Sequence, residues 1–191
     1  MKELIKISKE ELAQFPLDKY RGEIALIFNR REAERAILEI KKCNIIGMDT
    51  ETRPAFRKGV SYPVSLLQLA TEKKVYLFRL LETGSLQGII DILEDESKTK
   101  IGIAPGDDMK DLAKARGFKP RNIIDLNKLA QEKGYESIGA KKLSALVLGF
   151  RISKAQQVSN WEAKRLSKAQ IDYAATDAWI CREIFLKFNG N

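Results

Sequence analysis

Apolar residues follow one another along this chain first with the spacing of strands and then with the spacing of helices. Short runs typical of strands occupy 23–28, 44–51, 64–70, 75–78, 100–103 and 122–124. Stretches with one apolar face, typical of helices, occupy about 30–40, 86–93, 107–116, 126–133, 141–148 and 168–188. Residues 71–74 join two strands as a hairpin, and 149–161 form a polar connection. This order predicts an α/β domain with three layers, in which helices flank a mixed sheet.

Local signals mark where some of these elements begin and end. Residues 1–22 are polar and contain Pro16, so we expect a loose N-terminal arm, followed by one domain at 23–191. Asn29 is expected to cap the first helix. Ser167 is expected to cap the last one, with Gln170 completing a capping box. Gly117 is expected to end the helix at 107–116.

Composition narrows the class of protein. The chain has 191 residues, a net charge of +8 and a pI near 9.4, a balance that favours nucleic-acid binding. It contains no histidine, which excludes His-based catalysis and His-containing zinc sites. We expect neither a signal peptide nor a membrane span. Cys43 and Cys181 lie far apart and are expected to be buried thiols, which favours a cytoplasmic location.

An acidic pair ends the second predicted strand. Side chains alternate along a strand, so Asp49 and Glu51 project from the same face. Two neighbouring carboxylates repel each other, and a divalent ion such as Mg²⁺ or Mn²⁺ relieves that repulsion. The alternative is a strand that has simply reached solvent, and Asp-x-Glu alone does not decide between the two.

A second acidic group lies at the start of the helix at 107–116. Asp107 suits the N-cap position, where its side chain accepts a backbone N–H. Asp108 shares a face with Leu112 and therefore lies over the core-facing side of the helix. We interpret Asp108 as a metal ligand and Asp107 as the cap. The alternative is that both simply favour the helix dipole.

A third group lies on the last predicted helix. Tyr173 and Asp177 are four residues apart and share a face. Three alanines at 174, 175 and 178 leave room for another backbone or a ligand to approach. The tyrosine hydroxyl, with an ordinary pKa of about 10, can orient a water but is a poor base. An ordinary amphipathic helix remains the alternative for either residue taken alone.

Together these groups resemble the three motifs of the DEDD superfamily of 3′-5′ exonucleases, tyrosine subgroup. They follow the family order: Asp49-x-Glu51, then Asp108, then Tyr173-x-x-x-Asp177. Flanking stretches match as well, at 45–51, 64–70, Gly102, Leu112, 159–161 and 166–167. The resemblance covers about residues 23–188 and is closest to the Werner-syndrome exonuclease domain, and more distant to ribonuclease D. It implies a ribonuclease H-like fold with a mixed sheet of five or six strands.

The resemblance also implies a reaction: phosphodiester hydrolysis from the 3′ end of DNA or RNA, with two divalent ions, Mg²⁺ or Mn²⁺, releasing 5′-mononucleotides. Asp49, Glu51 and Asp177 would hold one ion, Asp49 and Asp108 would hold the second, and Tyr173 would orient the attacking water. Residues 105–107 add a residue before the second motif, so Asp107 remains the alternative ligand.

Other functions fit parts of this pattern. A catalytically inactive nucleic-acid-binding module would keep the fold, although complete motifs argue against it. A phosphotransferase or phosphatase with Asp49 as nucleophile would have a second Asp where this chain has Glu51. A purely structural basic domain would show no metal-dependent stabilisation.

Contacts to nucleic acid are sought in two basic stretches that flank the motifs. These are Arg53, Arg57 and Lys58 in the loop at 52–63, and Lys154, Trp161, Lys164 and Arg165 before the last helix. For each cation a solvated surface role is an equal alternative, and for Trp161 a place in the core. DNA and RNA, the end structure and protein partners all stay open.

Overall fold

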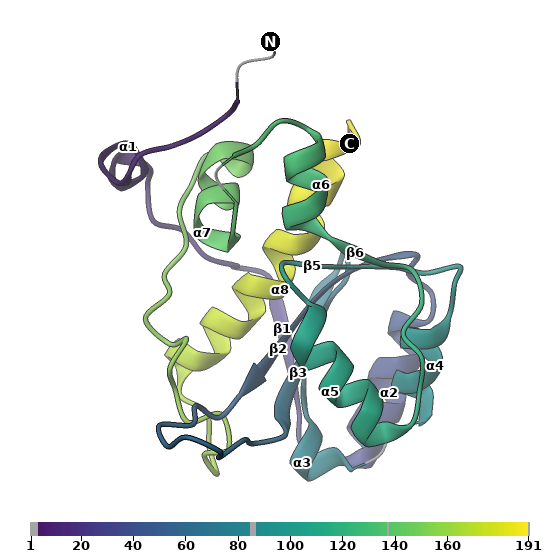
Figure 1. Ribbon diagram of the computed structural model, residues 1–191. Helices are drawn as coiled ribbons and strands as arrows, with labels where there is room; N and C mark the ends of the chain where they lie inside the picture. Colours follow the sequence, from purple (N-terminus) through teal and green to yellow (C-terminus); the bar gives the residue numbers. More distant parts are fainter. Residues whose placement is uncertain (1–3, 85–86, 137, 191) are drawn as a thin grey trace.

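Six strands form one mixed sheet in the order β1-β4-β3-β2-β5-β6 (Figure 1). This computed structural model describes residues 4–84, 87–136 and 138–190, apart from the side chain of Asp108. The strands are β1 (Glu23–Ile27), β2 (Ile45–Thr52), β3 (Val64–Ala70), β4 (Lys74–Arg79), β5 (Thr99–Gly102) and β6 (Ile123–Asp125). The six runs predicted from the sequence are therefore strands, and the mixed sheet is confirmed.

Strand β3 is the antiparallel member of the sheet. It pairs antiparallel with β2 on one side and with β4 on the other, whereas the pairs β1–β4, β2–β5 and β5–β6 are parallel. All seven residues of β3 are buried, as expected for a strand covered on both faces. The predicted hairpin between β3 and β4 is closed by Thr71, whose backbone N–H donates to the carbonyl of Lys74 at 3.0 Å.

Helices cover both faces of the sheet (Figure 1). One face packs against α2 (Arg30–Ile40), α4 (Gln87–Glu94) and α5 (Gly106–Arg116), with Met48 and Phe78 among the strand residues in that core. The other face packs against α8 (Lys168–Phe188), where Leu66, Val75 and Leu77 contribute. Because Met48 points toward α5, its neighbour Asp49 points toward α8.

Shorter helices complete the structure: α1 (Lys9–Gln14), α3 (Leu80–Thr83), α6 (Leu126–Glu132), α7 (Ala140–Leu143) and the π-helix η1 (Ser144–Leu148). The helix predicted at 141–148 is therefore α7 continued by a π turn. The capping box of Ser167 and Gln170 on α8 is confirmed, and Gly117 ends α5 in the left-handed region at φ 70°. Leu86, part of the apolar face of the helix predicted at 86–93, lies outside the described residues.

The N-terminal segment differs from the loose arm that we expected. Ser8 and Glu11 form a capping box that starts α1, and Leu12 of this helix is buried. Backbone hydrogen bonds also join the segment to the rest of the domain. The N–H of Ile5 donates to the carbonyl of Gly134, and the N–H of Arg151 donates to the carbonyl of Pro16. Pro16 interrupts the segment without preventing this packing, so the expectation of a loose arm was wrong.

Asp107 also differs from its predicted role. Helix α5 begins one residue earlier, at Gly106, with Pro105 at the N-cap position and no side-chain cap. Asp107 is fully exposed and forms an ion pair with Lys110 at 3.4 Å. Within the described parts of the chain, none of the helices is both long enough and apolar enough to span a bilayer.

Candidate metal centre

The end of β2 carries the first two carboxylates. Asp49 lies opposite Gln68 of β3 and Glu51 lies opposite Leu66, so both point to the face covered by α8. The register between β2 and β3 shifts directly after Glu51, before the last pair of Thr52 with Val64. Glu51 is nevertheless only 8% exposed. Two acidic side chains are thus held against a helix rather than in open solvent.

Helix α8 supplies the third carboxylate. Asp177 is 3% exposed and lies on the side of the helix that packs on the sheet, as do the fully buried Ala174 and Ala178. One ligand oxygen from each of Asp49, Glu51 and Asp177 lies within 4.8 Å of the other two. The predicted convergence of β2 and the last helix is therefore present, and it brings three negative groups together.

Tyr173 lies beside these carboxylates, one helical turn before Asp177. Its ring packs against Trp161 with 5.9 Å between ring centroids, and Trp161 is 1% exposed. Trp161 is therefore a core residue, and its candidate role in stacking on a base is wrong. Burial raises the pKa of the Tyr173 hydroxyl, and repulsion by Asp177 and Glu51 adds to the rise. The hydroxyl consequently stays protonated and can donate a hydrogen bond.

Lys154 reaches into the same place from the irregular segment before α8. Its Nζ donates to Asp177 Oδ2 at 2.9 Å and to the hydroxyl oxygen of Tyr173 at 3.3 Å. From the sequence, Lys154 is expected either to contact phosphates beside the site or to lie on a solvated surface. Nothing in the local sequence places its ammonium on a carboxylate of α8, because that contact depends on how the segment folds across the helix.

Burial and charge act against each other at this pair. Burial raises the pKa of the Asp177 carboxyl, and the attraction of Lys154 offsets part of that rise. For the ammonium of Lys154, burial lowers the pKa, but attraction by Asp177 and then by Asp49 and Glu51 outweighs burial, so the pKa is raised. Lys154 is therefore a charged ammonium group that faces a pocket of acidic side chains.

The donor set fits a hard divalent ion. All three groups offer carboxylate oxygen, the ligand type that Mg²⁺ and Mn²⁺ prefer. Asp177 Oδ1 is buried and has no hydrogen-bond partner among the described residues, so this oxygen is available to a ligand. The three groups border a cavity of about 440 Å³, whose lining also includes Ile103 and Ala104.

Asp108 is the predicted ligand that the structure does not place. Its backbone belongs to the first turn of α5, and this helix begins two residues after Ala104 on the rim of the cavity. Its side chain lies outside the described residues. Its role, like the catalytic roles of the other four site residues, stays a prediction.

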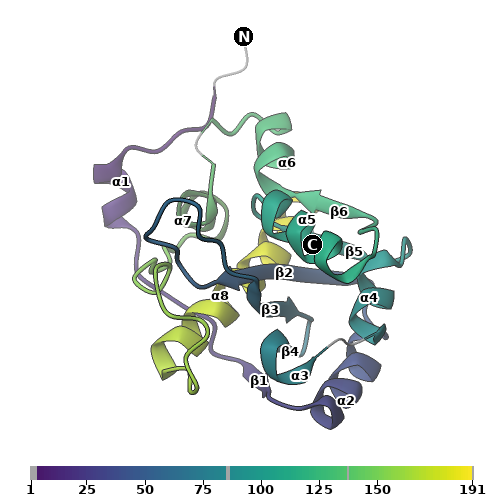
Figure 2. The ribbon, with the colours of Figure 1, turned by 60° about the horizontal axis from the view of Figure 1, so that its bottom comes forward.

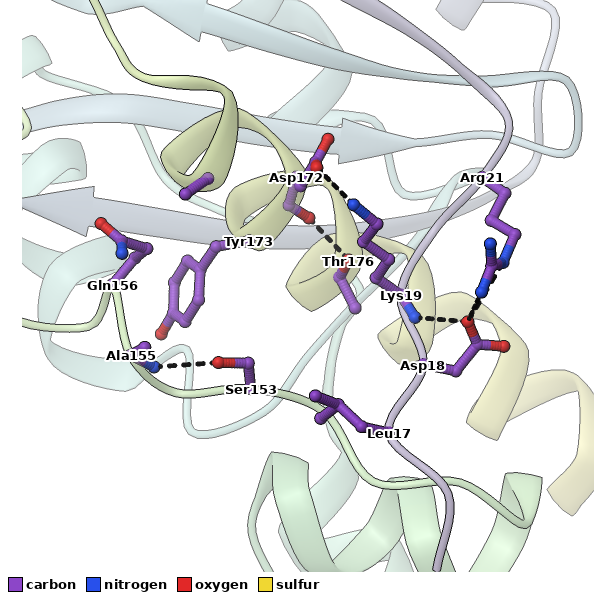
Figure 3. Close-up of a pocket in the computed structure, with 11 residues that line it drawn as sticks. Leu17, Asp18, Lys19, Arg21, Ser153, Ala155, Gln156, Asp172, Tyr173 and Thr176 are labelled. Carbon is purple, nitrogen blue, oxygen red and sulfur yellow. Dashed lines mark hydrogen bonds and ion pairs between the residues drawn. The ribbon is translucent and has the colours of Figure 1, made fainter.

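A second cavity, of about 410 Å³, lies against the ring of Tyr173 on the N-terminal side of the site (Figure 3). Its charged groups are paired with one another: Lys19 with Asp172 at 2.6 Å and Arg21 with Asp18 at 2.8 Å. Tyr173 lines both cavities. This cavity therefore offers a space next to the carboxylates, and its own charges are already satisfied.

The predicted basic loop lies next to the carboxylates. Figure 2 shows the connection from β2 to β3 on the same side of the molecule as the segment that leads into α8. The two border a third cavity, of about 550 Å³, with Phe56 and Arg57 on one side and Val158 on the other. Arg53 lies over the ring of Tyr62 at 4.6 Å and pairs with Glu162 at 3.1 Å.

The family model and two individual proteins that this chain resembles are all described as 3′-5′ exonucleases. Residues 24–190 match a family model described as 3′-5′ exonuclease. Over 133 residues the chain is 37% identical to the exonuclease 3′-5′ domain-containing protein 2 of Drosophila melanogaster, a match that covers 68% of this chain and 23% of that protein. It is 27% identical over 195 residues to a 3′-5′ exonuclease of Arabidopsis thaliana, covering 94% of this chain and 68% of that one.

A solved structure gives the same fold. The EXO domain of Nibbler from Aedes aegypti superposes with a TM-score of 0.82 at 24% identity, covering 90% of this chain and 91% of that one. The predicted ribonuclease H-like arrangement of a mixed sheet flanked by helices is thus confirmed. The chain spans about a quarter of the length of the Drosophila relative and about two thirds of the Arabidopsis one.

Proposed function

The chain belongs to the 3′-5′ exonuclease family, and we propose that it hydrolyses nucleic acid from the 3′ end with two divalent ions, Mg²⁺ or Mn²⁺, releasing 5′-mononucleotides. The observation that carries this proposal is the meeting of Asp49, Glu51 and Asp177 within 4.8 Å, with Tyr173 beside them. The chain has no histidine, so carboxylates, tyrosine and lysine are the groups that can act here.

Each site residue has a role in this proposal. Asp49, Glu51 and Asp177 would hold one ion, and Asp49 with Asp108 the other. When bound, the ions supply activation of the attacking water and stabilisation of the leaving oxygen. Tyr173 keeps its proton because its pKa is raised, so its hydroxyl orients the water instead of removing a proton from it.

The basic loop supports a nucleic-acid substrate. Thr52 borders the carboxylate cavity and Arg53, the next residue, borders the cavity beneath the loop, so the two cavities are neighbours. Among the described residues, the cavity beneath the loop is lined by the guanidinium groups of Arg53 and Arg57 and by no carboxylate. Phe56 is 84% exposed and offers a ring on which a base can stack. We propose that nucleotides upstream of the 3′ end lie here.

A degradation assay tests the proposal. Single strands of DNA and of RNA, labelled at the 5′ end, are incubated with the protein in Mg²⁺, in Mn²⁺ and in a chelator. We expect a ladder of products shortened stepwise from the 3′ end, formed only with metal. Asp49→Ala should lower the rate by more than about 100-fold, because it removes a ligand shared by both ions. Its melting temperature in chelator should not fall, because repulsion with Glu51 is relieved.

Two outcomes would contradict the proposal. Full activity of pure Asp49→Ala would show that the site is misassigned. Tight binding of strands by the wild-type protein, without cleavage in either metal, would favour the inactive binding module.

A cytoplasmic location remains our proposal, supported by the two free thiols, Cys43 and Cys181.

A further inference from the structure

Lys154 occupies one of the two carboxylate oxygens that Asp177 can offer to a metal ion. Asp177 Oδ2 accepts a hydrogen bond from the Lys154 ammonium at 2.9 Å. The same ammonium lies 5.1 Å from the centre of the Tyr173 ring. Asp49 and Glu51 also attract it. A divalent ion placed among these carboxylates would repel the ammonium, because both carry positive charge in a partly buried space. Lys154 and the ion therefore compete for Asp177.

The segment that carries Lys154 has space on both sides. Residues 153–160, here called the strap, are irregular or in turns and lie between the buried residues Ile152 and Trp161. Within the strap, the side chains of Lys154 and Gln157 line the carboxylate cavity. Those of Ser153, Ala155 and Gln156 line the cavity of Figure 3 on the other side. None of the strap residues is buried.

Short local hydrogen bonds give the strap its shape. The backbone of Gln157 donates to the carbonyl of Lys154 at 3.2 Å, and that of Ser159 donates to the carbonyl of Gln156 at 3.1 Å. These bonds can persist if the strap shifts as a unit. The ammonium of Lys154, in contrast, reaches α8 and links the middle of the strap to Asp177. A shift of the strap would therefore withdraw the ammonium without breaking these turns.

We propose that Lys154 is a tethered counter-cation, which holds Asp177 while no divalent ion is bound and withdraws with the strap when one binds. This inference rests on the proposed function, since it concerns the same carboxylates. It gives Lys154 two effects of opposite sign. The lysine stabilises the metal-free fold by balancing a buried carboxylate, and it weakens binding of the ion by occupying one of the ligand oxygens.

Calorimetric titration of the full chain with Mn²⁺ tests this inference without reference to cleavage. Four proteins are compared: wild type, Lys154→Met, Lys154→Arg and Lys128→Met. Methionine keeps the length and apolar stem of Lys154 and removes its charge. Lys128 is exposed on α6, so Lys128→Met removes the same charge from a distant surface. Circular dichroism in chelator confirms that each variant is folded.

We expect Lys154→Met to bind the first Mn²⁺ about tenfold more tightly than wild type, a change of about 1.4 kcal/mol. Lys154→Arg and Lys128→Met should stay within about twofold of wild type, or 0.4 kcal/mol. In chelator, Lys154→Met should melt at a lower temperature than wild type. Mn²⁺ should then raise its melting temperature by more than it raises that of wild type, because the tighter complex stabilises the fold further.

Equal or weaker Mn²⁺ binding by Lys154→Met would overturn the inference, as would the absence of Mn²⁺ binding in both proteins. Equal tightening in Lys128→Met would overturn it too, because net charge alone would then account for the change. The proposed function is tested separately. If Lys154→Met binds Mn²⁺ more tightly but wild type degrades no strand, the function is wrong and the counter-cation stands.

Discussion

Gly47 of β2 lies against the backbone of Ala178 in α8, so closely that a Cβ on Gly47 would be 2.2 Å from the carbonyl oxygen of Ala178. Gly47 precedes Asp49 by two residues, and Ala178 follows Asp177 directly. The approach of these two backbones therefore sets how near the carboxylates of the strand and the helix come. The small residues at 174, 175 and 178 were expected to admit another backbone, and the backbone they admit is that of β2.

Gly47→Ala is expected to disturb both the fold and the site. The added methyl meets backbone, which cannot rotate away, so α8 must move from the sheet. Overpacking of this kind lowers the free energy of unfolding by about 1–3 kcal/mol, measured by denaturant titration. Mn²⁺ binding should weaken in the same variant because Asp49 and Asp177 separate.

Gly106→Ala is the matched control for this substitution. A Cβ on Gly106, at the start of α5, meets nothing within 4 Å. Its unfolding free energy should be unchanged or higher by up to about 1 kcal/mol, since alanine favours a helix more than glycine does. Equal losses in both variants would show that the contact between Gly47 and Ala178 is not what destabilises the first.

Tyr173→Phe is expected to separate catalysis from metal binding. The ring and its packing on Trp161 remain, and the lost hydroxyl belongs to none of the metal ligands. The cleavage rate should fall by about 10²–10³-fold if the hydroxyl donates to a reacting oxygen, whereas Mn²⁺ affinity should stay within about twofold. The result is read from single-turnover rates and from calorimetry on the same preparation. A loss of Mn²⁺ affinity that matches the loss of rate would assign Tyr173 to the metal site instead.

The same residue makes a prediction about pH. The pKa of Tyr173 is raised by burial and by the neighbouring carboxylates, so it loses no proton near its ordinary value of 10. The wild-type rate should therefore show no fall that begins near pH 10 and is absent from Tyr173→Phe. Profiles of rate against pH for the two proteins should keep the same shape on the alkaline side.

The fold was predictable from the sequence where the residues of a single strand or helix determine its structure. The apolar runs gave the six strands, and alternation alone put Asp49 and Glu51 on one face of β2. The spacing of Tyr173 and Asp177 on one helical face was equally local. The capping box of Ser8 and Glu11 is an equally local signal that marks the start of α1, and the prediction of a loose arm from Pro16 and the polar composition does not include it.

Contacts between segments that lie far apart in the sequence could not be predicted from these local patterns. Lys154 reaches Asp177 only because the strap lies against α8, and no periodicity encodes that placement. Trp161 could be core or surface until the ring of Tyr173 was seen to cover it. Likewise Gly47 looks like any strand glycine in the sequence, and its function becomes visible only beside Ala178.

Lys100 predicts an unusual dependence of stability on pH. It is fully buried in β5, its ammonium donates to the carbonyls of Asp95 and Lys98, and burial lowers its pKa to about 8. Between about 8 and its ordinary 10.5, the unfolded chain holds a proton here that the folded chain has released. The unfolding free energy at this group therefore rises with pH, and the cost of the buried charge is fully present below about pH 8.

Comparison with Lys100→Met isolates this effect. Other groups titrate in the same range, but they are common to both proteins and cancel in the difference. The stability of wild type relative to Lys100→Met should increase by on the order of 1–3 kcal/mol between pH 8 and pH 10.5. Denaturant titrations across this range measure it. A difference that does not change with pH would mean that Lys100 keeps its ordinary pKa in the fold.

The basic loop between β2 and β3 makes the last prediction, and two substitutions in it should act differently. Phe56→Ala removes an exposed ring, so the dissociation constant for a single strand should rise by a factor that corresponds to about 1–3 kcal/mol, with nearly the same salt dependence. Arg57→Ala removes a cation, so affinity should fall and the slope of log affinity against log salt should shrink by about 1.

Asp49→Ala supplies the background for these measurements, because a strand bound to that variant is not degraded during the titration. Fluorescence anisotropy with strands of different length then locates the contact. If the loop holds nucleotides upstream of the 3′ end, a mononucleotide should bind both loop variants as it binds the background protein. A long strand should lose affinity in both. Equal losses for the mononucleotide and the long strand would move the contact into the carboxylate pocket, and no loss for either would leave the loop outside the substrate path.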